Sequence, residues 1–335
     1  MESKSVSASF KKSFVISADE NAKKLAFNTV FFQDEIKATD TIKVTAGTKF
    51  QDTKKEKPQH QSSIHLAWQP TEEKTFWMAF SRAIRMPSIL ESANDFEYRG
   101  ELNLDLSNPV FSELKKSGLT PYYVAQGSSD VNDEIYYTYE AGFRTKINAN
   151  LLFDAAFYNS KSDNMLVITK TSEIRINDPA GYIGFVAKEE NALAADISGA
   201  EVALDYFYSE AWHIKTAYTY YHSRIRTDQL PFEAGVKIAT DPFPENQVSL
   251  TSYWDIGSWQ LDMGVRYVDA IMEGEVPAYS VVNFRLNKQL TQKAEASVII
   301  NNLLDKDHLE YIDENYGPRP TMVSRGIYGV LNFDY

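Results

Sequence analysis

The chain has 335 residues and a formal net charge of −12, since 46 Asp and Glu outweigh 34 Lys and Arg, which excludes a nucleic-acid binder that relies on neutralising phosphates. Hydrophobic residues make up 43% of the chain and charged residues 24%, as in a folded protein rather than a disordered acidic segment. With 20 Tyr, 19 Phe and no Cys, the composition favours β-strands and excludes disulfides, Cys-ligated metals and a thiol nucleophile.

Residues 1–25 contain no uninterrupted apolar segment followed by a cleavage site, so we predict no signal peptide there. No window approaches about 18 consecutive apolar residues, which excludes a membrane protein built from helices. A membrane barrel is still compatible with the sequence, because its strands are short and apolar on one face only.

Alternation of apolar and polar residues recurs along the chain in runs of about ten residues, the length of a tilted strand that crosses a bilayer. In the run 41–50, Ile42 and Val44 share one predicted face, and Lys43 and Thr45 share the other. The pattern predicts an all-β fold with fourteen strands, at about 3–16, 24–36, 40–51, 60–70, 73–84, 136–147, 150–170, 196–208, 211–223, 246–256, 258–269, 277–288, 291–302 and 324–335.

The predicted connections between these strands alternate between tight turns and long loops. The longest loops are 85–135, 171–195, 224–245 and 303–323. Short turns at one rim, long loops at the other and an even number of antiparallel strands are typical of an outer-membrane barrel. A soluble β-sandwich also alternates and is the alternative interpretation, but it gives no reason for this sorting of loops. We expect a single domain over residues 1–335.

Six segments, in the order in which they occur, resemble the C-terminal barrel portion of TonB-dependent outer-membrane receptors. They are FFQDEIKATDTIKVTAGTKF at 31–50, FSRAIRMPS at 80–88, YEAGFR at 139–144, FDAAFYNSKSDNMLV at 153–167, VPAYSVVNFRL at 276–286 and NNLLDKDHLEY at 301–311. Tyr335 stands where that family ends in an aromatic residue. The resemblance implies an antiparallel transmembrane β-barrel in the outer membrane of a Gram-negative cell, with short periplasmic turns and long extracellular loops. About 14 strands of a larger barrel of about 22 would be present.

Receptors of that family also carry an N-terminal plug and a segment that engages TonB, and neither is recognisable here, so we expect a partial barrel that cannot by itself carry out energised transport. The resemblance implies a metal chelate such as a ferric siderophore as the ligand. It implies outer-membrane lipid and lipopolysaccharide as further partners, and TonB only through the plug. No nucleic acid and no cofactor are expected. A plugless passive channel and a soluble β-rich binding protein are the alternative functions.

No catalytic motif occurs, so we do not expect an enzyme. The histidines lack the spacing of metal ligands, and we expect no metal site among His60, His65, His213, His222 and His308. Three carboxylates gather in the longest loop, where a solvated turn is favoured over a Ca²⁺ site; they are Asp130, Asp133 and Glu134.

Ligand selectivity is expected in the long loops and in wall residues that face the lumen, because the lipid face is chemically uniform. Within 85–135, a guanidinium, two aromatic rings and an amide could bind an anionic, aromatic chelate; the residues are Arg99, Tyr122, Tyr123 and Gln126. Strand parity predicts six charged residues facing the lumen, namely Arg85, Glu140, Arg144, Lys146, Asp262 and Arg266. The alternative interpretation is that they only solvate the barrel interior.

Overall fold

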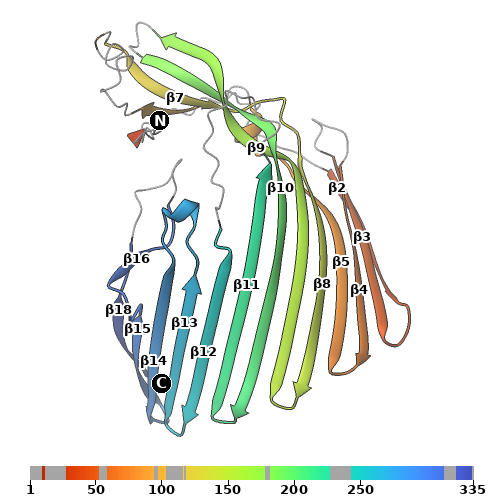
Figure 1. The fold of residues 1–335 in the computed structure, drawn as a ribbon, viewed down its shortest axis with the longest axis vertical. Coiled ribbons are helices and arrows are strands. Elements are labelled where there is room, and N and C mark those ends of the chain that lie inside the picture. The colour runs from red at the N-terminus through yellow and green to blue at the C-terminus, as the bar shows by residue number, and fades with distance from the viewer. Residues whose placement is uncertain are drawn as a thin grey trace.

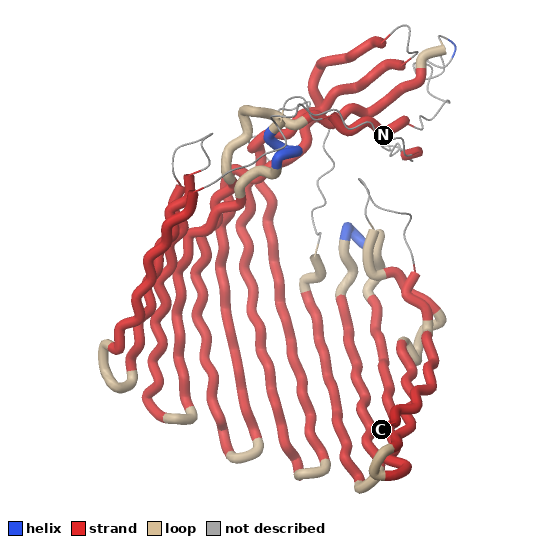
Figure 2. The backbone as a smooth tube through the Cα atoms, turned by 180° about the vertical axis from the view of Figure 1, so that it is seen from behind, coloured by secondary structure: helices blue, strands red, loops and turns tan. Residues whose placement is uncertain are grey.

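The protein is described here by a computed structural model that covers residues 10–11, 28–52, 59–93, 97–102, 116, 118–177, 182–226, 243–312 and 322–333. Long antiparallel strands form a curved wall, and a smaller group of strands leans over one end of it (Figures 1 and 2). Tight turns join the wall strands at the lower rim, and the longer connections lie at the upper rim. The predicted sorting of short and long connections is thus present in the structure.

The wall strands are neighbours in the sheet in nearly the order in which they occur in the chain. They are β2 (Asn28–Lys37), β3 (Ile42–Asp52), β4 (Gln59–Thr71), β5 (Lys74–Arg85), β8 (Glu134–Asn148), β9 (Leu151–Asn177), β10 (Tyr182–Ser209), β11 (Trp212–Arg226), β12 (Asn246–Ile256), β13 (Trp259–Val268), β14 (Tyr279–Thr291), β15 (Ala294–Asn301) and β18 (Gly326–Phe333). Each corresponds to one of the predicted strands, which confirms the all-β antiparallel fold. Within the described chain, β2 and β18 are the two ends of this sheet path.

The remaining elements are short. They are β1 (Phe10–Lys11), a helical turn α1 (Ile89–Ser92), β6 (Glu97–Leu102), β7 (Thr120–Gln126), a 3₁₀ turn η2 (Met272–Gly274), β16 (Asp307–Leu309) and β17 (Met322–Ser324). Among the described residues, no helix combines the length and the hydropathy that crossing a membrane requires.

The pairing register sorts the side chains of the wall onto two faces, because directly opposed residues of antiparallel strands point to the same side of a sheet. Trp68 stacks on Phe76 with ring centroids 5.1 Å apart, and Phe76 stacks on Phe143 at 4.5 Å. Following the register from strand to strand gives one continuous apolar face. It includes Ile36, Val44, Leu66, Met78, Phe157, Leu204, Ile214, Leu250, Met263, Phe284, Val298 and Leu331.

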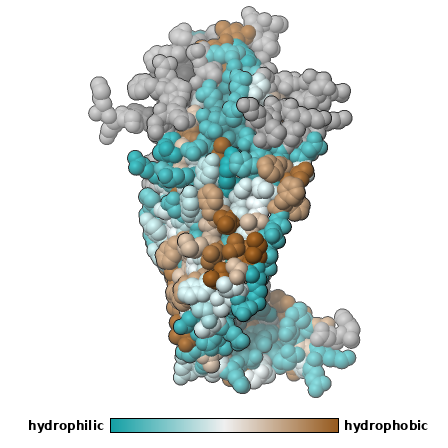
Figure 3. Space-filling model, turned by 90° about the vertical axis from the view of Figure 1, so that its right-hand side faces the viewer, coloured by the Kyte–Doolittle hydropathy of each residue, from teal (hydrophilic) through white to brown (hydrophobic). Residues whose placement is uncertain are grey.

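Large side chains of this apolar face are open to the surroundings: Met78 is 63% exposed, Phe157 59% and Leu331 64%. On the side seen in Figure 3, hydrophobic residues gather at mid-height, between hydrophilic residues near the turns and near the loops. The opposite, polar face carries charged residues such as Lys43 and Glu140. The predicted alternation therefore holds across the whole wall.

The predicted loop 85–135 is wrong in part, because the structure places α1, β6 and β7 within it. Ser88 begins α1 through a capping box: its hydroxyl accepts the backbone N–H of Glu91, and the Glu91 carboxylate accepts the backbone N–H of Ser88. The predicted loop 171–195 is also too long, since β9 continues to Asn177 and β10 begins at Tyr182. Both strands keep pairing beyond the wall, with register shifts where their direction changes.

Where the structure describes it, the predicted first strand at 3–16 does not pair with a strand of the wall. Within the described part of it, Phe10 pairs with Leu102 and Lys11 pairs with Glu101, so β1 adds to β6. The described edge of the wall is β2 instead, and the other residues of 3–16 lie outside the described part of the chain.

The group of elements above the wall has an enclosed hydrophobic core, like that of a water-soluble protein. We call this group the loop assembly: α1, β6, β7, residues 127–133, and the upper ends of β9 (166–177) and β10 (182–191). Its apolar side chains are enclosed, for example Val124 with 1% exposure, Val186 with 2% and Val131 with 5%. This core positions the site described next.

Candidate functional site

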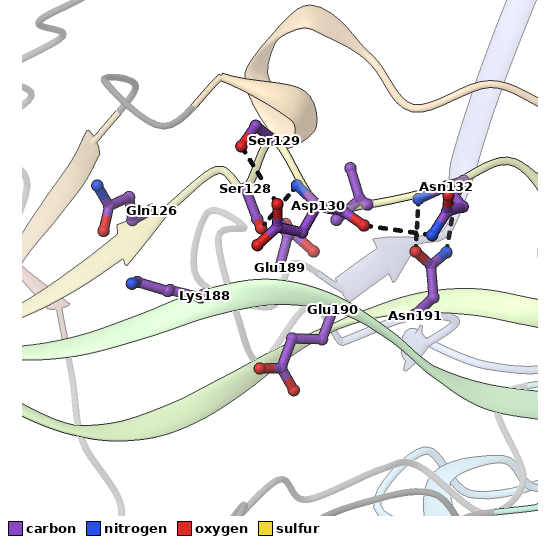
Figure 4. A pocket seen from close by; sticks show the side chains of 10 residues that line it. Gln126, Ser128, Ser129, Asp130, Asn132, Lys188, Glu189, Glu190 and Asn191 are labelled. Atoms are coloured by element: carbon purple, nitrogen blue, oxygen red, sulfur yellow. Dashed lines mark hydrogen bonds between the residues drawn. The ribbon is translucent and has the colours of Figure 1, made fainter. Parts of the chain in front are cut away.

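A pocket of about 690 Å³ opens where the wall passes into the loop assembly (Figure 4). It lies between the segment that follows β7 and the bend of β10. Its lining residues are Gln126, Ser128, Ser129, Asp130, Val131, Asn132, Lys188, Glu189, Glu190 and Asn191. Most of these side chains are polar, and they come from two segments that are about 60 residues apart in the sequence.

The floor of the pocket is β10, which is paired on both sides up to Lys188. Lys188 lies opposite Thr169 of β9 in antiparallel register and opposite Gln126 of β7 in parallel register. The pairing of β10 with β9 shifts register between Asn191 and Leu193, at the bend. Residues 189–191 pair with β9 alone, so the support from both neighbours holds at the Lys188 end of the pocket floor.

Asn191 of β10 is hydrogen-bonded to the segment on the opposite side of the pocket, at Asn132. Its side-chain oxygen accepts the backbone N–H of Asn132 at 2.6 Å, and its amide group donates to the backbone carbonyl of Asn132 at 2.9 Å. The same amide group donates to the carbonyl of Asn164 at 2.6 Å, where β9 has a left-handed residue with a φ of 59°. Figure 4 shows the two asparagines facing each other across the pocket's end.

The 127–132 segment also packs tightly against α1. The backbone N–H of Ser128 donates to the carbonyl of Glu91 at 2.8 Å. A Cβ atom at Gly127 would collide with the backbone carbonyls of Leu90 and Ala93, so this position requires glycine. The capped turn α1 therefore fixes the position of the 127–132 segment, which lines the pocket.

Arg85 connects α1 to the start of β8. Its guanidinium donates to both carboxylate oxygens of Glu134, at 2.6 and 2.8 Å, and to Glu91 at 3.1 Å. The Glu134 side chain is only 5% exposed and also accepts the backbone N–H of Leu166 and the hydroxyl of Tyr136. Burial acts to raise the pKa of Glu134, but these hydrogen bonds together hold it below its ordinary value.

The pKa of Glu189 is shifted in the opposite direction to that of Glu134. Burial raises its pKa from 4.5 to about 7, and the neighbouring negative charges of Glu91 and Glu134 act in the same direction, against the opposing charge of Arg85. This carboxyl group is therefore poised to change its charge near neutral pH. Burial likewise raises the pKa of Asp133, against the opposing charge of Arg82.

The lining of the pocket carries an excess of negative charge. Asp130, Glu189 and Glu190 supply carboxyl groups, and Lys188 is the cation of the lining. The Lys188 ammonium group lies 3.8 Å from the carboxylate of Glu173, a residue of β9 outside the lining. The arrangement favours a positively charged or neutral occupant on electrostatic grounds.

The structure brings only part of the predicted ligand set to this pocket. Gln126 lines it, and its side-chain oxygen accepts a hydrogen bond from Arg175 at 3.1 Å. Arg99 lies on β6 opposite Val124, and Tyr122 and Tyr123 follow each other on β7. The side chains of these three residues lie outside the described part, so their role in ligand binding stays a prediction.

The predicted lumen-facing residues all lie on the polar face of the wall by register. Arg144 is paired with Asp154, and Arg266 with Glu310 at 2.8 Å. Glu140 lies opposite Ala79 and Tyr158, Lys146 opposite Leu152, and Asp262 opposite Tyr253 and Arg285. That this face encloses a lumen stays a prediction.

The three clustered carboxylates of the longest loop take different roles. Asp130 lines the pocket, Asp133 is buried, and Glu134 is bound by Arg85. Across the residues that the structure describes, no group of three His, Asp or Glu side chains is placed to hold a metal ion.

The sequence analysis did not identify four residues of the pocket, namely Lys188, Glu189, Glu190 and Asn191. They form an unbroken polar run inside the predicted loop 171–195, and such a run is usually solvated. The available signal was the run of four polar residues between apolar neighbours, Ala187 and Ala192, within a segment rich in strand-forming residues.

Comparison with known proteins gives one family match and a set of similar folds. A family model described as TonB dependent receptor-like, beta-barrel matches residues 7–303. No curated protein matches the sequence.

Three solved structures illustrate the similarity of fold. The siderophore receptor PirA from Acinetobacter baumannii aligns with a TM-score of 0.68 and 15% identity over 92% of this chain and 46% of its own. A variant of the ferric enterobactin receptor PfeA from Pseudomonas aeruginosa gives 0.67 and 12%, over 92% and 45%. The copper transporter OprC gives 0.62 and 11%, over 92% and 48%. The chain thus spans about half the length of these structures and shares their fold.

Proposed function

Because the chain belongs to the TonB-dependent receptor-like β-barrel family, we propose that it forms part of the wall of an outer-membrane receptor that takes up a scarce nutrient. The match agrees with the resemblance predicted from the sequence. The family is one of receptors, in agreement with the expectation that the chain is not an enzyme.

The proposed ligand is a small metal chelate of the ferric siderophore type. Support comes from the similar folds, which include a siderophore receptor, a ferric enterobactin receptor and a copper transporter. In this proposal the surrounding partners are outer-membrane lipid and lipopolysaccharide on the apolar face. Transport is energised by TonB acting on a plug in the whole receptor.

The continuous apolar face of the wall is the observation that carries the proposal. Residues such as Phe157 and Leu331 are large, apolar and exposed at the same time. Water disfavours such a surface, whereas the hydrocarbon of a bilayer accepts it. The loop assembly and its pocket lie at one end of the wall, where an outer-membrane receptor meets its ligand from outside the cell.

The test is uptake by living cells. A strain that lacks its own receptors would be given the gene of the whole receptor and grown on scarce iron supplied as one of several ferric chelates, with and without a functional TonB. We expect growth on at least one chelate that requires both the receptor and TonB. Growth that requires the receptor but not TonB would indicate a passive channel, and no receptor-dependent growth on any chelate would contradict the proposal.

A further inference from the structure

We propose that the pocket between residues 126–132 and 188–191 selects a positively charged metal chelate and disfavours a polyanionic one. This inference rests on the proposed function and narrows its ligand class. It differs from the expectation drawn from Arg99 and its neighbours, which favours an anionic, aromatic chelate.

The first argument is the balance of charges around the cavity. Asp130, Glu189 and Glu190 line it against a single lining cation, Lys188. Within the described chain, none of the three carboxyl groups forms an ion pair, whereas Lys188 lies 3.8 Å from Glu173. Their charges are therefore available to an occupant, and the charge of Lys188 is offset.

The second argument is that the other nearby cations are already engaged. The guanidinium of Arg85 is divided between Glu134 and Glu91, and that of Arg175 bonds to Glu173 at 2.6 Å and to Gln126 at 3.1 Å. An anion that entered the pocket would have to compete with these carboxylates. A cation would meet carboxyl groups that form no ion pair within the described chain.

The third argument is the half-buried position of Glu189. The charged and titratable groups around it are Arg85 of β5, Glu91 of α1, Glu134 of β8, and Lys188 and Glu190 of β10 itself, with Asp130 from the facing segment. Burial raises the pKa of Glu189 to about 7. A cationic ligand stabilises the ionised carboxylate, so its binding releases a proton and becomes tighter as the pH rises through that value.

The experiment compares chelates that differ in charge. The full chain, as its gene encodes it, would be purified in detergent and titrated by calorimetry. The matched probes are ferrioxamine B, a trishydroxamate Fe(III) chelate with a free ammonium group, and its N-acetylated form, which lacks that charge. Ferric enterobactin, a tris-catecholate chelate with three negative charges, is the anionic probe.

We expect ferrioxamine B to bind about tenfold more tightly than its acetylated form at pH 8, with ferric enterobactin the weakest of the three. The preference should shrink at pH 6. The double variant Glu189→Gln and Glu190→Gln should lose most of the preference and its pH dependence. Glu201→Gln, a change on the wall, is the control and should leave both unchanged.

Equal binding of the two ferrioxamine forms, or tighter binding of ferric enterobactin, would overturn the inference and leave the proposed function intact. Binding of none of the three chelates would overturn the inference as well. The growth assay decides separately on the proposed function, because it scores receptor-dependent and TonB-dependent uptake whatever the charge of the chelate.

Discussion

The wall and the loop assembly place their apolar side chains in opposite environments. In the wall, large apolar residues such as Met78 and Leu331 are exposed, and the buried apolar residues include small ones such as Ala79 and Ala155. In the loop assembly, Val124, Val131 and Val186 are enclosed, as in a water-soluble domain. Large apolar side chains are therefore exposed in one part of the chain and buried in the other.

The difference shows that the surrounding medium decides whether a large apolar side chain is stable in an exposed or in a buried position. Burial of apolar area stabilises a protein in water, whereas in a bilayer the same area can remain on the surface at no cost. Beside the loop assembly, the enclosed carboxylate of Glu134 keeps its charge because the more exposed Arg85 pairs with it. The predictions below test this contrast, from the largest expected effect to the smallest.

A charge on the apolar face should be the most damaging change. We expect Met263→Arg to lower the free energy of unfolding by about 2–4 kcal/mol near the bilayer midplane, because hydrocarbon does not solvate the guanidinium. Gln260→Arg, on the polar face of the same strand, should cost far less. Denaturant unfolding in lipid vesicles measures both. The same contrast is expected for Val44 and Leu331 against Thr45, and equal costs on the two faces would contradict the assignment of the faces.

Loss of Arg85 should loosen the loop assembly. Arg85→Ala leaves the buried carboxylate of Glu134 without its cation, and we expect a local destabilisation of about 2 kcal/mol. Hydrogen exchange of residues 127–133 should speed up, while the wall should stay unchanged. Arg144→Ala is the control, since Arg144 is 71% exposed and its ion pair on the wall is worth little. Equal effects of the two variants would contradict the role of Arg85.

The stability of the loop assembly should fall as the pH rises past neutrality. The folded-state pKa of Glu189 is raised from 4.5 to about 7, so the folded state holds its proton more firmly than the unfolded state. The stabilisation is complete below the ordinary value and is lost as the pH rises through about 7.

Hydrogen exchange of the 186–191 backbone, corrected for the intrinsic rate at each pH, should therefore show weaker protection at pH 8 than at pH 6. Glu189→Gln should remove this dependence. Glu140→Gln, on the wall, should leave it in place. An unchanged pH profile in Glu189→Gln would show that another group is responsible.

Surface ion pairs of the wall should matter least. Lys43 and Glu35 lie 3.0 Å apart, and both side chains are more than half exposed. We expect Lys43→Ala to change the free energy of unfolding by less than about 0.5 kcal/mol, because water screens the pair. Vesicle unfolding with and without added salt checks this, and a loss comparable to that of Met263→Arg would contradict it.

The wall could be predicted from the sequence because its information is local. Alternation with a period of two, as in Ile42 to Thr45, sets the face of each side chain independently of distant residues. The turns follow from the same pattern, and Gly257 with its φ of 64° sits in one of them. The bounds of β12 agree with the prediction for the same reason.

The loop assembly could not be predicted in this way because its structure depends on distant partners. Arg85 and Glu134 are 49 residues apart, and Asn132 and Asn191 are 59 apart. The parallel pairing of β7 with β10 leaves no periodic signal that identifies the partner strand. The pocket residues 188–191 were therefore assigned to a loop.

The central claim, that one face of the wall meets lipid and the other does not, can be tested with two tryptophans of the chain. Trp68 lies opposite Phe76 on the apolar face, and Trp77, the next residue after Phe76, lies opposite Gly142 on the polar face. The two indoles are therefore at nearly the same depth. Variants that retain only one of them, with the other tryptophans changed to Phe, would be placed in vesicles with brominated lipid. We predict strong quenching of Trp68 fluorescence and little quenching of Trp77; equal quenching of both would contradict the claim.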